Sequence, residues 1–284
     1  MSTYKIKFEQ LRQHSEFSEV LSALERGFSE YAVDFFLIGA VARDLWMTAI
    51  NGIAPNRITR DIDFAVLVND NGTYQSLKKY LIEYEGFQPV KDNAFVLLWK
   101  GHIQIDLLPF GNIADKDSKV SIEGVGLTSV NMPGFMEVYN AGLPNVELEG
   151  KHQFKFCTLP GIVILKLLAW EDRPEIRKDD IKDFGTLLQH FFSMYSEQIY
   201  EHHSDLFGSL DIDLKEVGAR VMGREMKQIS TRNPKLHNRL TTLFHENTQD
   251  MRTSKIALLL SQFFDNTVET NIKLLLAILT GLQE

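Results

Sequence analysis

Apolar residues recur along the first part of this chain in two spacings, one typical of helices and one typical of strands. Residues 15–31, 41–47 and 73–84 carry apolar side chains three and four positions apart, which predicts amphipathic helices. Short apolar runs predict buried strands at 34–38, 64–68, 94–99 and 103–110. Residues 111–150 are rich in turn-forming residues, and together with the strand-like pieces 119–122, 146–148 and 153–156 they are predicted to form the edge of the sheet.

After Leu159-Pro160-Gly161 the pattern becomes helical throughout. Helical spacing of apolar residues occurs at 162–170, 177–192, 195–207, 213–229, 234–244, 252–264 and 267–279. No fixed period recurs among these segments, so we expect a helical domain and not a solenoid. The sequence therefore predicts two domains, 1–158 and 159–284.

Composition limits the class of protein without indicating its activity. The 284 residues are 44% hydrophobic and 24% charged, as in ordinary globular proteins, and the net charge of −8 argues against adhesion to nucleic acid over the whole surface. The single cysteine, Cys157, excludes an internal disulfide and is expected to be a small buried hydrophobe. No stretch has the length and apolarity of a membrane span or a signal peptide, so we expect a cytoplasmic protein with no membrane partner.

Two aspartates, Asp61 and Asp63, stand one residue apart at the head of the apolar run 64–68. Because strand side chains alternate between faces, both must point to one side, with Ile62 on the other. Two like charges held together are tolerable where a cation neutralises them, and oxygen ligands on a strand suit Mg²⁺ together with substrate phosphates. The alternative is that one aspartate caps a turn while the other is solvated.

A third acid, Asp106, interrupts a strand that otherwise reads as interior, on the same face as Gln104. An unpaired carboxylate is costly to bury, so Asp106 needs a partner. A Mg²⁺ ion shared with the first two aspartates would supply one. The alternative is an ion pair with an arginine such as Arg43 or Arg60.

Two further features are candidates for contacts with phosphate. Gly39-Ala40 joins the strand 34–38 to a predicted helix, and backbone N–H groups at such a junction face an anion, although a plain tight turn also explains the glycine. Lys166 lies inside the apolar run 161–170. Its charge indicates either a phosphate contact or a side chain that reaches solvent from the outer face of a helix.

The stretch from Lys215 to Arg239 is locally basic in an acidic protein. It predicts a track for an RNA backbone, and the alternative is a solvated helix face. Its cations are Lys215, Arg220, Arg224, Lys227, Arg232, Lys235 and Arg239. A second acidic pair, Asp211 and Asp213, precedes a helical run and is expected to cap a helix rather than form a site.

Taken in order, the segments Leu37–Asp44, Asp61–Phe64 and Ile105–Leu107 resemble motifs of the nucleotidyltransferase superfamily, which includes polymerase beta, the CCA-adding enzymes and small bacterial transferases. Lys166, Arg173 and the segment Arg177–Phe184 further resemble the AbiEii-type nucleotidyltransferase toxins of abortive-infection toxin–antitoxin systems. The resemblance covers about Phe35–Leu188. Gly39-Ala40 departs from the Gly-Ser or Gly-Gly usual in the family, which removes a hydroxyl that could touch phosphate.

The resemblance implies an α+β fold with an N-terminal nucleotidyltransferase-type mixed β-sheet flanked by helices, followed by a C-terminal helical domain. It also implies catalysis with two Mg²⁺ ions and an NTP substrate. The implied metal ligands and catalytic residues are Asp61, Asp63 and Asp106, and the implied nucleotide contacts are Gly39, Ala40, Arg43, Arg60, Lys166 and Lys178.

The leading hypothesis is therefore a Mg²⁺-dependent nucleotidyltransferase that moves a nucleoside monophosphate onto RNA, tRNA or protein, as the toxin of a toxin–antitoxin pair with an antitoxin partner. Two alternatives stay open. One is a catalytically silent relative that acts as an interaction module. The other is a transferase that modifies a small molecule such as an antibiotic.

Overall fold

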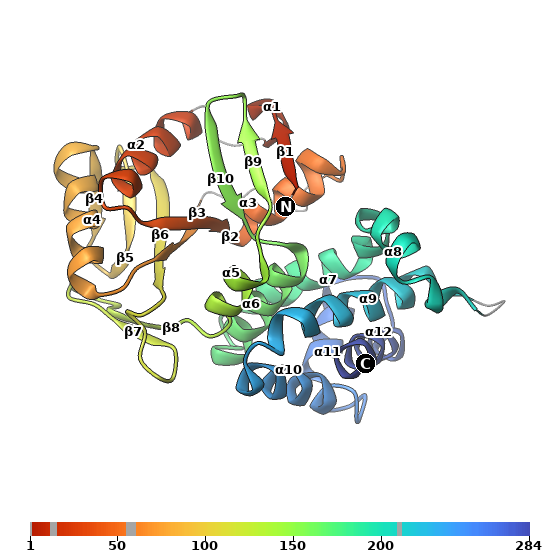
Figure 1. Ribbon diagram of the computed structural model, residues 1–284. Coiled ribbons are helices and arrows are strands. Elements are labelled where there is room, and N and C mark those ends of the chain that lie inside the picture. Colours follow the sequence, from red (N-terminus) through yellow and green to blue (C-terminus); the bar gives the residue numbers. More distant parts are fainter. Residues whose placement is uncertain (1, 12–15, 55–60, 209–211) are drawn as a thin grey trace. The chain divides into compact units, whose positions relative to one another are not determined.

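The computed structural model describes residues 2–11, 16–54, 61–208 and 212–284 (Figure 1). The chain divides into two compact units, Met1–Thr158 and Leu159–Glu284. The first unit is built on a mixed β-sheet flanked by helices, and the second is helical. The predicted α+β class, with a sheet followed by helices, is confirmed.

Within the described residues, the main sheet of the first unit has eight strands in the order β1-β9-β10-β2-β3-β6-β5-β4. Their bounds are β1 (Thr3–Ile6), β2 (Asp34–Ile38), β3 (Asp61–Leu67), β4 (Phe87–Val90), β5 (Asn93–Trp99), β6 (Ile103–Phe110), β9 (Asn145–Leu148) and β10 (His152–Phe156). The pairs β1–β9, β10–β2 and β3–β6 are parallel, and the other neighbours are antiparallel. Two short strands, β7 (Lys119–Ser121) and β8 (Ser129–Asn131), form a separate hairpin.

Helices α2 (Phe17–Glu30) and α4 (Asn71–Tyr84) lie beside the sheet and pack on each other (Figure 1). The predicted apolar stripe of α2 is buried along its whole length, from Phe17 to Phe28. Gly27 allows the close approach, because a Cβ there would lie 2.8 Å from Cδ2 of Leu81. The Asp70 carboxylate begins α4 by accepting a hydrogen bond from the backbone N–H of Thr73 at 2.8 Å.

Several parts of the first unit differ from the prediction. The hairpin β9–β10 is not the sheet's edge, because β10 pairs with β2 inside the sheet, and the edges are β1 and β4. The strands β1 and β4 and the helices α1 (Phe8–Leu11) and α5 (Phe135–Ala141) were not predicted. The helix expected at 41–47 begins earlier, as α3 (Gly39–Asp44), and continues as a π-helix over Leu45–Ile50. Short elements carry few residues of periodic pattern, so tertiary pairing decides them.

The second unit follows the predicted helical segments closely. Its helices are α6 (Leu159–Asp172), α7 (Lys178–Met194), α8 (Ser196–His202), the 3₁₀ turn η2 (Ser204–Phe207), α9 (Leu214–Ser230), α10 (Pro234–Glu246), α11 (Lys255–Phe263) and α12 (Val268–Gln283). Helices α9 and α12 touch backbone to backbone at two glycines. A Cβ on Gly223 would lie 2.1 Å from the Ile278 carbonyl oxygen, and one on Gly281 would lie 2.0 Å from that of Arg220.

The structure also tests the predictions made for the Asp211–Asp213 pair, for Cys157 and for membrane-spanning helices. Asp213 caps α9, and its carboxylate accepts from the backbone N–H of Lys215 at 2.7 Å, whereas Asp211 lies outside the described residues. Cys157 is fully buried, as predicted, and burial raises the pKa of its thiol. Among the described helices, none combines the length and the apolar composition that crossing a membrane requires.

Candidate active site

The three predicted acids come together on two neighbouring strands. Asp61 and Asp63 lie on β3 and Asp106 lies on β6, which runs parallel beside it. The register places Asp63 directly beside Asp106, and Asp61 directly beside Gln104. Adjacent strands are about 4.8 Å apart, and aligned residues present their side chains to the same face. The three carboxylates therefore project from one face of the sheet, and each residue is only partly buried.

Gly39 lies against this group of acids. Strand β2 ends at Ile38, the register partner of Asp63, so the chain turns into α3 directly beside the Asp63 carboxylate. Gly39 has φ +67°, and a Cβ built there would lie 2.0 Å from Oδ2 of Asp63. Both the backbone angle and the space require glycine. Ala40, which follows, is 5% exposed.

Gln104 also belongs to the site, although no chemical role was predicted for it. Its Nε2 donates to Oδ1 of Asp106 at 2.8 Å, and it is the register partner of Asp61. The amide thus orients Asp106 and occupies one of its oxygens. Strand alternation predicts that Gln104 lies on the same sheet face as Asp106, the acid face formed by Asp61, Asp63 and Asp106. That alternation is the sequence signal that could have identified Gln104 as a site residue.

Tyr74 supports the β6 strand from α4. Its ring is fully buried, and its hydroxyl donates to the Leu107 carbonyl oxygen at 2.7 Å. Burial, followed by the negative charge of Asp106, raises the pKa of Tyr74. The tyrosine therefore stays protonated and serves to anchor β6, next to the residue that carries the acid.

The oxygen ligands of the three acids suit a Mg²⁺ site that substrate completes, and not a site closed by protein ligands alone. Carboxylate oxygens are the ligands that Mg²⁺ prefers, and Mg²⁺ in phosphoryl-transfer sites keeps waters and substrate phosphates in its shell. Within the described parts of the chain, no group of three or more histidine, cysteine or acidic side chains is placed to hold a metal ion by itself. The residues fit a Mg²⁺ ion completed by substrate phosphates, and they do not fit a closed cage made by protein alone.

Arg43 and Arg60 were predicted to contact nucleotide. Arg43 is 2% exposed, and its Nε and Nη2 donate to Oδ1 of its neighbour Asp44 at 2.9 and 2.7 Å. A guanidinium held in this way is part of the interior of the first unit, and the prediction that Arg43 contacts nucleotide stays a prediction. Arg60 lies outside the described residues.

Lys166 belongs to the second unit, where it is buried between two acids of α7. Its Nζ lies 2.9 Å from Oδ1 of Asp180 and 2.7 Å from Oδ2 of Asp183. Burial disfavours its charge, but the two carboxylates outweigh this and raise the pKa of Lys166. The expected alternative, a side chain that reaches solvent, is wrong, since Lys166 is 8% exposed. A phosphate would have to compete with two carboxylates for this ammonium group.

Lys178 is the first residue of α7 and is exposed. Its prediction as a nucleotide contact stays a prediction.

The basic stretch 215–239 is divided by ion pairs. The pairs are Arg220 with Glu284, Arg224 with Glu284 and Asp205, and Arg239 with Glu171. Lys215, Arg232 and Lys235 are exposed. Acids from other helices thus neutralise part of the charge, and the stretch is weaker as a phosphate track than its sequence suggested.

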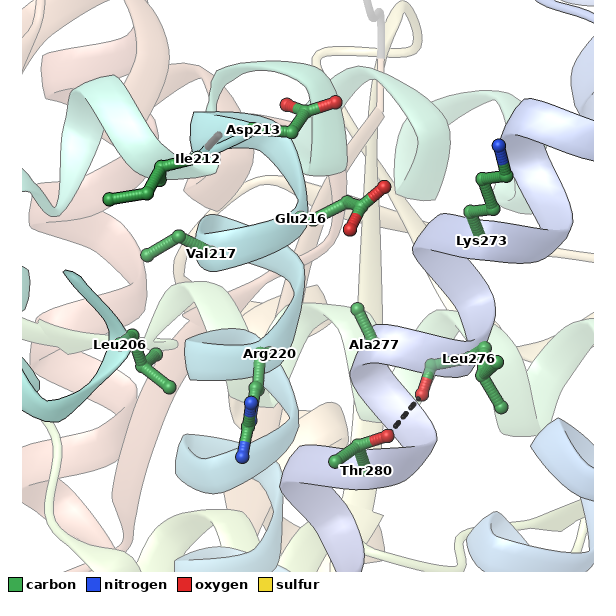
Figure 2. Close-up of a pocket in the computed structure, with 10 residues that line it drawn as sticks. All are labelled: Leu206, Ile212, Asp213, Glu216, Val217, Arg220, Lys273, Leu276, Ala277 and Thr280. Carbon is green, nitrogen blue, oxygen red and sulfur yellow. Dashed lines mark hydrogen bonds between the residues drawn. The ribbon is translucent and has the colours of Figure 1, made fainter. Parts of the chain in front are cut away.

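A cavity of about 540 Å³ lies between α9 and α12 of the second unit (Figure 2). Its charged lining carries both signs, with Asp213 at the N-cap of α9, Glu216 and Arg220 on α9, and Lys273 on α12. The hydroxyl of Thr280 donates to the Leu276 carbonyl oxygen of the same helix at 2.9 Å. This lining favours neither an anion nor a cation, and none of the predicted catalytic acids belongs to it.

No protein-family model matches the chain, and no curated protein matches it significantly. Two solved structures are similar to it in part. The solution structure of the antibiotic-resistance factor ANT(2'')-Ia has 13% identity over 67% of this chain and 100% of its own, with a TM-score of 0.33. The crystal structure of ANT(2'')-Ia in complex with adenylyl-2''-tobramycin has 11% identity over 67% and 97%, with a TM-score of 0.37. At such TM-scores neither structure bears on the fold or the function, and the likeness to AbiEii-type toxins remains a prediction.

Proposed function

We propose that this protein is a Mg²⁺-dependent nucleotidyltransferase that moves a nucleoside monophosphate from an NTP to an acceptor hydroxyl. The observation that carries the proposal is the register of β3 and β6, which sets Asp63 beside Asp106 with Asp61 on the same face. The close approach of Gly39 to Asp63 supports the proposal. It brings the backbone proposed to contact phosphate next to a carboxylate proposed to bind metal.

Each residue has a separate role in the proposed reaction. Asp61, Asp63 and Asp106 would hold the metal ions, and Asp106, which accepts a hydrogen bond from Gln104, would also accept the proton of the acceptor hydroxyl. The backbone at Gly39-Ala40 lies beside the triphosphate. Bound Mg²⁺ neutralises phosphate charge and lowers the pKa of the attacking hydroxyl. The acceptor oxygen forms a bond to the α-phosphorus, the bond from that phosphorus to the bridging oxygen breaks, and pyrophosphate leaves.

The test is transfer of label from each α-labelled NTP, with Mg²⁺, into total RNA, tRNA, the protein itself and an amino sugar. Asp63→Asn and Asp106→Asn should abolish labelling while the circular dichroism and melting temperature stay near those of the wild type. Asp117→Asn, at an exposed aspartate in the same unit, is the matched control and should label normally. Equal labelling by Asp63→Asn, or no label in any lane together with no melting shift from Mg·NTP, would refute the proposal and favour a silent interaction module.

We further propose RNA as the acceptor class, with the exposed cations of 215–239 in contact with its phosphates. Replacing Lys215, Arg232 and Lys235 by glutamine should weaken RNA binding and reduce the slope of affinity against salt concentration. Arg239→Gln is the comparison variant and should change the salt slope less, because Glu171 already neutralises the Arg239 charge. An unchanged salt slope in the triple variant would exclude this track.

A toxin role follows from the resemblance and has a direct test. Induced expression of the wild type should arrest bacterial growth, whereas Asp63→Asn should not. A candidate antitoxin protein would then be identified by co-expression, because it should restore growth. Arrest that persists with Asp63→Asn would separate toxicity from nucleotidyl transfer.

A further inference from the structure

Lys78, on α4, is a buried lysine that the proposed reaction does not use. It is 9% exposed, and its Nζ donates to the Ala94 carbonyl oxygen at the start of β5. Its Nζ also lies 5.7 Å from the centre of the Tyr74 ring, one helical turn earlier. A carbonyl and an aromatic face satisfy an ammonium group only in part, since the group has three donors.

No ion pair compensates this charge within the parts of the chain that the structure describes. Burial accordingly lowers the pKa of Lys78. The contrast with Lys166 is direct, because two carboxylates there raise the lysine pKa. A buried ammonium without a carboxylate is unusual, and an anion that arrived from solvent would be stabilised beside it.

Lys78 lines a cavity of about 430 Å³ in the first unit. The volume falls within the range of about 300–1,000 Å³ that small-molecule sites occupy. Most of the wall is apolar, with Pro89, Val90, Val96 and Val125 contributing, and among the described residues that line it the only other charged one is Lys91. The described part of the wall therefore carries two positively charged side chains and no negatively charged one.

The local fold builds this cavity. Strand β4 loses its register with β5 between Pro89 and Val90, which moves the strand edge away from its neighbour. The loop that carries Val125 is held over β5 by the backbone N–H of Ala94, which donates to the Leu127 carbonyl oxygen at 2.9 Å. Val125 itself is 73% exposed, so the cavity has a wall that faces solvent.

We propose that this cavity binds a small monocarboxylate with an apolar body, whose carboxylate pairs with the Lys78 ammonium while its chain lies on the valine and proline wall. The ligand class follows from the two features together. The unpaired ammonium selects an anion, and the apolar lining selects against inorganic phosphate or a sugar phosphate. None of the three proposed catalytic acids lines this cavity, but Val96 of its wall is the register partner of Asp106, so the cavity adjoins the sheet face that carries the acids. The binding proposed here does not require nucleotidyl transfer.

Octanoate is the test probe, titrated by calorimetry and by the methyl NMR signals of Val96 and Val125 in the full-length protein. Octanoate should bind saturably and shift both signals, and acetate, which has no apolar body, should not. Lys78→Met should weaken octanoate binding about tenfold or more, because a charge-assisted hydrogen bond is lost. Lys91→Met, at the exposed lysine of the rim, should weaken it less.

A second pair of variants keeps the test decisive if Lys78→Met fails to fold. Val125→Glu and Val125→Gln change an exposed side chain and differ only in charge. Val125→Glu should weaken octanoate binding several-fold more than Val125→Gln, since only the glutamate repels a carboxylate. Absence of saturable binding, or equal affinities in the two Val125 variants, would overturn the proposal. Binding that shifts neither valine signal would also overturn it.

Discussion

The carboxylate of Asp63 fills the space beside the backbone of Gly39, where any other residue would place its Cβ. The predicted turn and the predicted metal-binding strand are thus in contact through one glycine. This contact ties the position of a candidate catalytic acid to the residue at which β2 becomes α3.

Gly39→Ala should strongly reduce nucleotidyl transfer, because the new methyl group must displace the Asp63 carboxylate. It should also lower the free energy of unfolding by about 1 kcal/mol or more, since alanine is strained at positive φ. Gly52→Ala is the control, with the same φ of +67° and no atom of the described residues within 4 Å of the added Cβ. Equal losses of transfer activity in the two variants would mean that backbone strain, and not displacement of the Asp63 carboxylate, causes the loss.

Gln104→Met should lower kcat more than it changes KM for the NTP, because it removes the donor that orients Asp106 and leaves the acid itself in place. The expected loss is about tenfold, the cost of one hydrogen bond to a charged group. Steady-state kinetics measure it. Gln88→Met, at an exposed glutamine on β4, should leave both constants unchanged.

Lys166→Met should destabilise the protein by about 3–5 kcal/mol in urea unfolding, because the two buried carboxylates of Asp180 and Asp183 lose the ammonium group that both contact. Lys178→Met, at the exposed start of α7, should cost little. If Lys166→Met instead kept its stability and lost only affinity for the NTP, the lysine would be a phosphate contact and its ion pairs would be secondary.

The stability of the protein should fall as the pH drops below about 6.5, in part because of His203. Burial, and next the positive charge of Arg224, lowers the pKa of His203 from its ordinary value. The unfolded chain therefore binds the proton first, and the native state loses stability between pH 6.5 and the lower native pKa. His203→Asn should flatten this dependence in urea titrations at several pH values. His202→Asn, at the exposed neighbour, should leave it as in the wild type.

Long periodic segments of this chain were predictable from the sequence. The apolar stripe of α2, the strands β2, β3, β5 and β6, and the helices of the second unit all lie close to their predicted positions. Such segments bury one face of a helix or a whole strand. Their local pattern of apolar residues therefore already shows which side chains must be buried. Strand alternation likewise predicted that Asp61 and Asp63 share one face of their strand and that Asp106 shares a face of its strand with Gln104.

Tertiary structure alone decided which of these faces meet. The position of β10 between β9 and β2, the register of Asp63 with Asp106, and the two acids around Lys166 all join residues distant in the sequence. Lys78 is a similar case, since its helical pattern does not reveal that its ammonium group meets a carbonyl oxygen and an aromatic ring. A residue's face is set by its own backbone, which local sequence determines, whereas its partners are set by long-range pairing, whose free energy is spread over the whole sheet or helical bundle.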